Sequence, residues 1–144
     1  MLVVTLTTWP LECFSMSAIV FGSAPLARMP ADLAERLALA VLDVAGAAPQ
    51  VARFASPGDT VVVLGAGGKS GLLCCAEARR RVGASGKVIG LEASPRFAED
   101  LRALGICDTV AAIDARDPLA VRAATIELTG GRGADLTFSC VNVP

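Results

Sequence analysis

From residue 60 onward, short β-branched runs alternate with longer helical stretches. The predicted strands cover residues 60–64, 87–92, 109–113 and 134–141. The predicted helices cover residues 72–81, 95–104 and 118–129. Strands that alternate with helices through short loops are typical of a parallel sheet wound with right-handed crossovers. We therefore expect an α/β fold with a partial, doubly wound (Rossmann-like) parallel sheet in the strand order 3-2-1-4.

The first 30 residues do not follow this alternation. Residues 1–22 are largely apolar, but Pro10 and Glu12 interrupt the run and no Lys or Arg precedes Arg28. Neither a membrane span nor a secretory signal is predicted from such a segment. Helical pieces are expected from about residue 31 to about residue 54. We interpret residues 1–30 as an irregular extension or the remnant of a substrate-facing region, and residues 31–144 as a dinucleotide-binding domain truncated after its fourth strand.

Composition limits the classes of partner. The chain has 144 residues, 53% of them hydrophobic, which is enough for one domain with a core. Its formal net charge of −1 offers no bulk attraction for nucleic acid or an anionic membrane surface. Five cysteines without Cys-x-x-Cys spacing, and no histidine, argue against a metal site and for reduced thiols in the cytoplasm. Cys74 and Cys75 lie on an apolar predicted helix, so we expect them in the core.

A glycine-rich turn, residues 65–71, directly follows the first strand of the predicted sheet. A strand, a glycine turn and a helix in this order bring backbone N–H groups and a helix N-terminus to one point, where phosphate binds. Gly65 and Gly67 occupy the first two positions of the dinucleotide fingerprint, where the turn must be tight and the backbone must approach a pyrophosphate. The third position is Ser70 instead of glycine, with Gly71 just behind it.

The fingerprint also requires an acid about 20 residues beyond the turn, at the end of the second strand. Glu92 stands there. A carboxylate at this point accepts hydrogen bonds from ribose hydroxyls and repels a 2′-phosphate, so Glu92 favours NAD over NADP as the cofactor. Ser94 and Arg96 nearby leave NADP possible. The alternative for Glu92 is an ordinary exposed acid at a strand end.

The same turn has a second interpretation, as a Walker-type nucleotide loop. Gly68, Lys69 and Ser70 match the last three residues of that motif, and residues 110–114 resemble the apolar strand that ends in a magnesium-side Asp. The first glycine of the motif falls at Val63, inside the strand, so the loop is too short to enclose a β-phosphate. In the favoured dinucleotide interpretation, Lys69 is either a cation beside the pyrophosphate or a solvated loop lysine, and Ser70 is a candidate helix cap.

Four stretches of the chain resemble the L-erythro-3,5-diaminohexanoate dehydrogenases of lysine fermentation: residues 42–47, 61–74, 86–90 and 140–144. The likeness runs from about residue 16 to the last residue. It implies an NAD(P)-dependent oxidoreductase of the wider medium-chain dehydrogenase type. The implied reaction is the oxidative deamination of a small 3,5-diamino acid to a 5-amino-3-oxo acid. Members of the family are substantially longer, so we interpret the chain as a fragment.

Two other interpretations remain open from the sequence. One is a dinucleotide-binding module of another medium-chain dehydrogenase, and the other is a nucleotide-triphosphate-binding domain. In either dehydrogenase interpretation, the fourth strand at residues 135–141 forms an unprotected sheet edge. Exposed edges pair with other chains, so we expect homo-oligomers or self-association through this edge.

The sequence assigns no secure catalytic base. Asp43 is the best candidate, because an acid among apolar neighbours is costly to bury without a partner such as a substrate ammonium. Its alternative role is the N-cap of a helical piece that begins at Val44. Asn142, just past the fourth strand, is expected near the nicotinamide ribose by analogy with the fold. Asp114, at the end of the third strand, is expected near the adenine.

Overall fold

The computed structural model describes residues 2–6, 16–20 and 30–141. The chain divides into two compact units, Met1–Glu35 and Arg36–Pro144. In the first unit, β1 (Leu2–Leu6) pairs with β2 (Met16–Val20) in antiparallel register, with Leu2 opposite Val20. This strand pair lies within the segment that the sequence marks as an extension.

Two short helices, α1 (Glu35–Leu42) and α2 (Ala47–Phe54), precede the sheet of the second unit. In the described parts of the chain, no single helix is both long enough and apolar enough to cross a membrane. Among these described helices, only α1 and α2 taken together have that length and apolar composition, and they are bent by 50° at the break between them.

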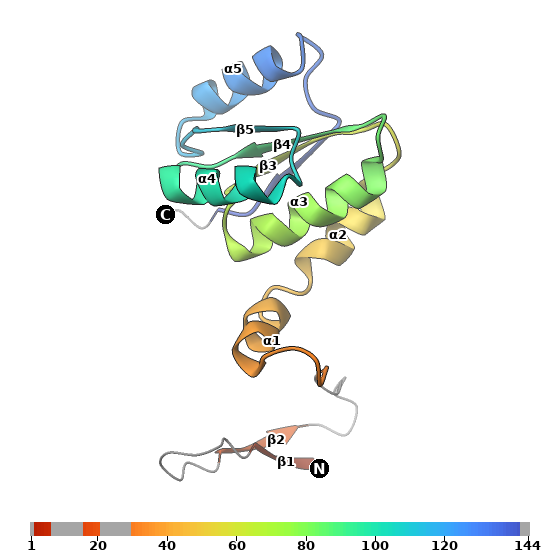
Figure 1. Cartoon of the computed structure of the whole chain (residues 1–144), viewed down its shortest axis with the longest axis vertical. Helices are drawn as coiled ribbons and strands as arrows, with labels where there is room; N and C mark the ends of the chain where they lie inside the picture. Colours follow the sequence, from red (N-terminus) through yellow and green to blue (C-terminus); the bar gives the residue numbers. More distant parts are fainter. Residues whose placement is uncertain (1, 7–15, 21–29, 142–144) are drawn as a thin grey trace. The chain divides into compact units, whose positions relative to one another are not determined.

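The second unit is built on a four-stranded parallel sheet. Its strands are β3 (Thr60–Leu64), β4 (Lys87–Leu91), β5 (Thr109–Ala111) and β6 (Leu136–Ser139). They lie in the order β5-β4-β3-β6, and all three neighbouring pairs are parallel (Figure 1). Counted from β3, this is the order 3-2-1-4, so the predicted topology is confirmed. The last two strands are shorter than the sequence indicates, β5 ending at Ala111 and β6 spanning four residues.

Helices cover both faces of this sheet (Figure 1). One face packs against α3 (Lys69–Val82) and α4 (Pro95–Leu104), and the other packs against α5 (Pro118–Leu128). Val61 and Val63 of β3 point to the first face, and Val62 points to the second. All three valines are fully buried, because a central parallel strand has no solvent-facing side. This explains why the strand is a continuous apolar run and not an alternating one.

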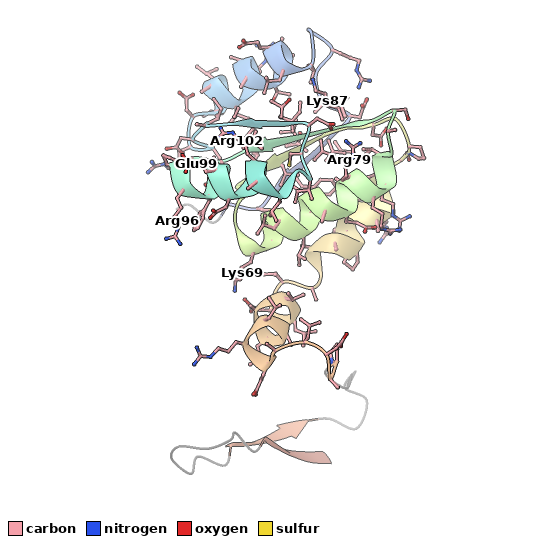
Figure 2. All side chains as sticks on the ribbon, viewed as in Figure 1. Lys69, Arg79, Lys87, Arg96, Glu99 and Arg102 are labelled. Carbon is pink, nitrogen blue, oxygen red and sulfur yellow. The ribbon has the colours of Figure 1, made fainter. Side chains whose placement is uncertain are left out.

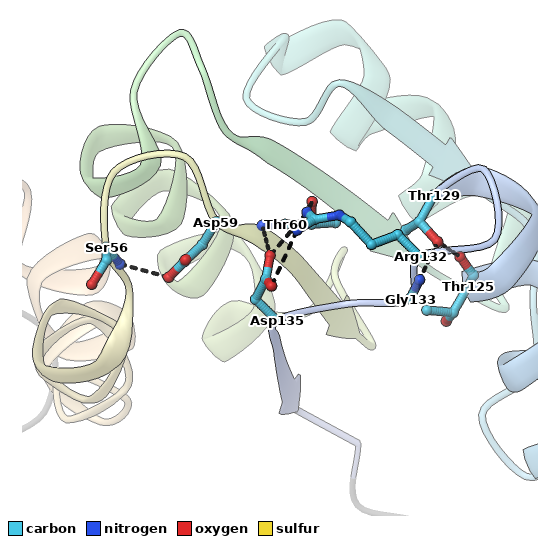
Figure 3. A network of polar contacts seen from close by, with 8 residues as sticks. All are labelled: Ser56, Asp59, Thr60, Thr125, Thr129, Arg132, Gly133 and Asp135. Carbon is cyan, nitrogen blue, oxygen red and sulfur yellow. Dashed lines mark hydrogen bonds and ion pairs between the residues drawn. The ribbon is translucent and has the colours of Figure 1, made fainter.

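Polar side chains fasten β3 and β6 together at their amino ends (Figure 3). The N–H of Thr60 donates to Asp135 Oδ2 at 2.7 Å, and the N–H of Asp135 donates to the carbonyl of Thr60 at 2.9 Å. Arg132 forms an ion pair with Asp135 at 3.0 Å and also contacts the Thr60 hydroxyl. The hydrogen bond from Thr60, followed by the charge of Arg132, lowers the pKa of Asp135. These contacts set the register of the two strands at the end opposite the glycine turn.

In the described residues, β6 forms one edge of the sheet and pairs with β3 alone. Thr137 and Ser139 are exposed, whereas Leu136 and Phe138 are partly buried. The self-association through this edge that the sequence suggests stays a prediction.

Candidate functional site

The glycine turn is held by the end of the neighbouring strand. Gly65 has φ +69°, a conformation that favours glycine. Its N–H and that of Ala66 both donate to the carbonyl of Leu91, the last residue of β4, at 2.9 and 3.2 Å. The N–H of Gly68 then donates to the carbonyl of Gly65 at 3.2 Å. These three backbone hydrogen bonds fix where α3 begins.

The first N–H groups of α3 are open. Among the described residues, no group accepts a hydrogen bond from the N–H of Lys69, Ser70 or Gly71, whereas the N–H of Leu72 donates to the carbonyl of Gly68 at 2.9 Å. Free N–H groups at a helix N-terminus carry partial positive charge and bind anionic oxygen atoms. The donors available to a phosphate are therefore those of residues 69–71, and not those of Gly65 and Gly67.

Gly71 provides the close helix-to-strand contact that the fingerprint assigns to its third glycine. A Cβ at Gly71 would lie 2.2 Å from the carbonyl oxygen of Gly65 and 2.7 Å from the Cα of Ala66. The predicted role of Ser70 as a helix cap is wrong, because Gly68 is the N-cap and no side chain caps α3. The helix begins at Lys69, three residues earlier than the sequence indicates, and this places Gly71 against the turn.

Glu92 joins the turn to the start of α4. Its Oε2 accepts a hydrogen bond from the N–H of Gly67 at 2.9 Å, and its Oε1 accepts one from the N–H of Ser94 at 2.9 Å. Ser94 is the N-cap of α4, and its hydroxyl accepts from the N–H of Phe97 at 3.5 Å. Only 8% of Glu92 is exposed, so it is not a freely solvated strand-end acid.

The close approach of α4 explains why residue 67 is glycine. A Cβ there would lie 2.6 Å from the Cβ of Phe97 and 3.1 Å from Glu92 Oε2. Gly67 and Glu92 are 25 residues apart in the sequence, and the fold brings them into direct contact. Each carboxylate oxygen has two lone pairs and uses one of them within the protein, so further donors can still bind to Glu92.

Lys69 and Asp43 form a pair at the entrance to α3. The Nζ of Lys69 lies 2.6 Å from Oδ2 of Asp43, with 59% and 65% of the two side chains exposed. Figure 2 shows Lys69 extending from the first turn of α3. The hydrogen bond from Lys69 lowers the pKa of Asp43.

The expected burial of Asp43 and its alternative role as an N-cap are both wrong, whereas its role as a catalytic base stays a prediction. Asp43 directly follows α1 and is not buried, because the neighbouring Leu39 and Leu42 are themselves more than half exposed. It does not cap the next helix either, since α2 begins at Ala47 with Gly46 as its N-cap. A carboxylate with a lowered pKa is also a weaker base, which reduces its value as a proton acceptor.

Asp114 and Asn142 are the two remaining residues that the sequence predicts near the cofactor. Asp114 lies beyond the end of β5 and forms an ion pair with Arg116 at 2.6 Å. Hydrogen bonds from the side chain and backbone of Arg116 lower the pKa of Asp114 to about 2. Its expected position near an adenine stays a prediction. Asn142 lies outside the described residues.

A cavity of about 400 Å³ opens beside the turn. Its lining comes from Ala47 and Gln50 of α2, Ser70 and Cys74 of α3, and residues 138–141 at the end of β6. The sequence does not predict the part played by α2 or by Phe138. In an open α/β sheet, ligands bind outside the carboxyl ends of the strands, which is where this cavity lies.

Two curated proteins match the chain over most of its length. The L-erythro-3,5-diaminohexanoate dehydrogenase of Acetoanaerobium sticklandii is 44% identical over 126 residues, and that of Fusobacterium nucleatum is 42% identical over 127 residues. The resemblance predicted from the sequence is confirmed. Each match covers 88% of this chain but only 37% of the dehydrogenase, so the chain spans little more than a third of these relatives. No family model matches the chain.

Several solved structures are similar to this chain in fold. AibC superposes with a TM-score of 0.65 at 30% identity, over 85% of this chain and 35% of its own. A mycobacterial quinone oxidoreductase superposes with a TM-score of 0.63 at 25% identity, over 81% of this chain and 35% of its own. The sheet and its helices therefore have the architecture of the dinucleotide-binding domain of medium-chain oxidoreductases.

Proposed function

We propose that this chain is the cofactor-binding part of an NAD(P)-dependent oxidoreductase similar to L-erythro-3,5-diaminohexanoate dehydrogenase. The contact between Glu92 and Gly67 carries the proposal. It places a nearly buried carboxylate directly against a turn whose following N–H groups are open. A dinucleotide has both a ribose diol and a pyrophosphate, and this pair of features fits both groups.

Different residues would bind different parts of the cofactor. The open N–H groups of residues 69–71 would bind the pyrophosphate, with Lys69 as a nearby cation that already has Asp43 as a partner. Glu92 would accept the ribose hydroxyls, and its charge would disfavour the 2′-phosphate of NADP, although Arg96 lies near enough in sequence to leave NADP possible. The cavity lined by Ser70, Cys74 and residues 138–141 would take the nicotinamide end.

The finer proposal concerns the substrate. We infer that it is a small amino acid with a second amine, and that the reaction is the oxidative deamination of a 3,5-diamino acid to a 5-amino-3-oxo acid. The names of the two curated relatives support this inference. When bound, the nicotinamide would accept the hydride from the amine-bearing carbon. This chain's described residues would bind and orient the cofactor and exclude water from the cavity beside the turn.

Calorimetric titration with NADH and with Mg-ATP separates the dinucleotide site from a Walker-type loop. We expect saturable binding of NADH and no magnesium-dependent binding of ATP. Val63 is fully buried in β3, so no loop precedes Gly65 that could enclose a triphosphate. ATP binding that is lost in Lys69→Ala would contradict the proposal, whereas retention of NADH binding in that variant would support it. Lys87→Ala is the matched control. The Nζ of Lys87 donates to the carbonyl of Leu128, away from the turn, so its loss should not affect NADH binding.

The substrate class is tested by the formation of NADH from NAD. We expect NADH with L-erythro-3,5-diaminohexanoate and none with lysine, because only the first carries an amine on carbon 3. NADH formation with simple alcohols and not with the diamino acid would instead favour another medium-chain dehydrogenase. This outcome would contradict the proposed substrate class but not the proposed dinucleotide site.

A further inference from the structure

Four cysteines lie in the described part of the second unit, and two of them meet at the cavity beside the turn. The sulfur of Cys74, on α3, lies 3.6 Å from the sulfur of Cys140, just after β6. Both residues line the cavity, and neither is in a disulfide. The sequence places them 66 residues apart, so only the fold brings them together.

The two thiols differ in access. Cys74 is only 3% exposed and is packed in the core beneath the turn, whereas Cys140 is partly exposed at the cavity wall. The sulfurs are about 1.6 Å farther apart than the roughly 2.05 Å of a disulfide bond, a gap that small side-chain movements can close. An accessible thiol with a second thiol behind it is the arrangement of an attacking and a resolving cysteine.

We propose that Cys140 and Cys74 form a reversible disulfide by exchange with a small-molecule disulfide that enters the cavity. The thiolate of Cys140 attacks one sulfur of the small disulfide, which forms a mixed disulfide and releases one small thiolate. The sulfur of Cys74, after losing its proton to solvent, then attacks the sulfur of Cys140 and releases the second small thiolate. Two protein thiols are oxidised and one small disulfide is reduced to two thiols, so atoms and electrons balance.

The surroundings of Cys140 favour its role as the attacking group. A hydrogen bond from the Cys74 thiol stabilises the Cys140 thiolate and lowers the pKa of Cys140 to about 7, while burial acts in the opposite direction. The same hydrogen bond, together with burial, raises the pKa of Cys74. Apart from these two thiols, the lining contributed by α2, α3 and residues 138–141 contains no titratable or charged side chain.

A bond between these sulfurs would affect the glycine turn. The segment of Cys140 and Val141 lies directly against Gly65, since a Cβ on that glycine would be 2.8 Å from Val141 Cγ1 and 3.1 Å from the carbonyl oxygen of Cys140. Drawing Cys140 toward α3 would narrow the cavity between them. The expected effect on NADH binding rests on the proposed function, in which this cavity holds the nicotinamide end of the cofactor.

The experiment treats the full 144-residue chain with oxidised glutathione, then blocks free thiols and maps the peptides by mass spectrometry. We expect one linked pair, assigned by fragmentation to Cys74 and Cys140, with the loss of two hydrogens and full reversal by dithiothreitol. Cys140→Ser is expected to abolish both the glutathione adduct and the link. Cys107→Ser, which replaces another partly buried thiol of the same core, is expected to keep both. An adduct on Cys140 that never passes to Cys74, or a link between Cys75 and Cys107, would overturn the proposal.

Two further readouts separate the possible failures. Below pH about 7 the rate of adduct formation is expected to rise about tenfold per pH unit and then level off, because only the thiolate attacks. A rate that keeps rising past pH 9 would overturn the role of Cys140 as the attacking thiol. NADH affinity is expected to fall at least tenfold on oxidation and to recover on reduction. Equal NADH affinity of the oxidised and reduced forms would contradict the narrowing of the cavity. If neither form binds NADH, the proposed function is wrong, and the peptide mapping alone then tests whether the disulfide forms.

Discussion

Gly71→Ala is expected to destabilise the second unit by about 3 kcal/mol, as overpacking against backbone atoms does. The added Cβ would lie 2.2 Å from the carbonyl oxygen of Gly65 and 2.7 Å from the Cα of Ala66. Neither atom belongs to a flexible side chain, so α3 would have to move away from β3. Thermal unfolding followed by far-UV circular dichroism should show a melting temperature lower by roughly 10–20 °C.

Gly46→Ala is the matched control for this change. Gly46 has φ −67° in the right-handed helical region, and a Cβ there would meet no atom within 4 Å. The free energy of unfolding should be unchanged or higher by up to about 1 kcal/mol, because alanine restricts the unfolded chain. Equal melting temperatures for Gly71→Ala and the unmodified chain would mean that α3 does not press on the turn in the way described.

Glu92→Ala is expected to weaken NADH binding by roughly 10- to 100-fold, because hydrogen bonds to a charged acceptor contribute about 1.5–3 kcal/mol. The change removes the acceptor proposed for the ribose hydroxyls. It also leaves the N–H groups of Gly67 and Ser94 without their acceptor. Titration calorimetry gives the dissociation constant, and circular dichroism establishes whether the variant is folded.

A comparison of NADH with NADPH distinguishes a ribose contact from damage to the turn. Damage would weaken both cofactors equally, whereas removal of the Glu92 charge should weaken NADH and improve the relative affinity for NADPH. Glu99→Ala removes an exposed acid of α4 and serves as the control, with no expected change for either cofactor (Figure 2). If Glu92→Ala keeps the original NADH affinity and the original ratio of NADH to NADPH affinity, Glu92 does not contact the bound cofactor.

The sequence predicts those parts of the molecule that depend on local patterns. The continuous apolar run of β3 identifies a central parallel strand, and the alternation that follows it predicts the strand order that the structure confirms. Glu92 could be selected by its spacing from the turn alone. Its contact with Gly67 follows from parallel strands that end at the same edge of the sheet.

The errors arise where the outcome depends on packing between elements. Ser70 and Gly71 could not be told apart, because their roles depend on the residue at which α3 begins, and the glycine N-cap at residue 68 gives no side-chain signal. The apolar neighbours of Asp43 predict that it is buried. The leucines of α1 are instead exposed in the described structure, and a hydrophobic pattern alone does not say which apolar surface is covered.

The contact of Thr60 with Asp135 and Arg132 has a consequence at the far end of the sheet. It aligns β6 with β3, and this alignment determines which residues lie beside the glycine turn at the other end of these strands. A slip of one residue would turn Phe138 and Cys140, which pack with α3 and α4, to the opposite face of the sheet. The side chains that line the cavity beside the turn therefore depend on polar contacts at the opposite end of β3 and β6.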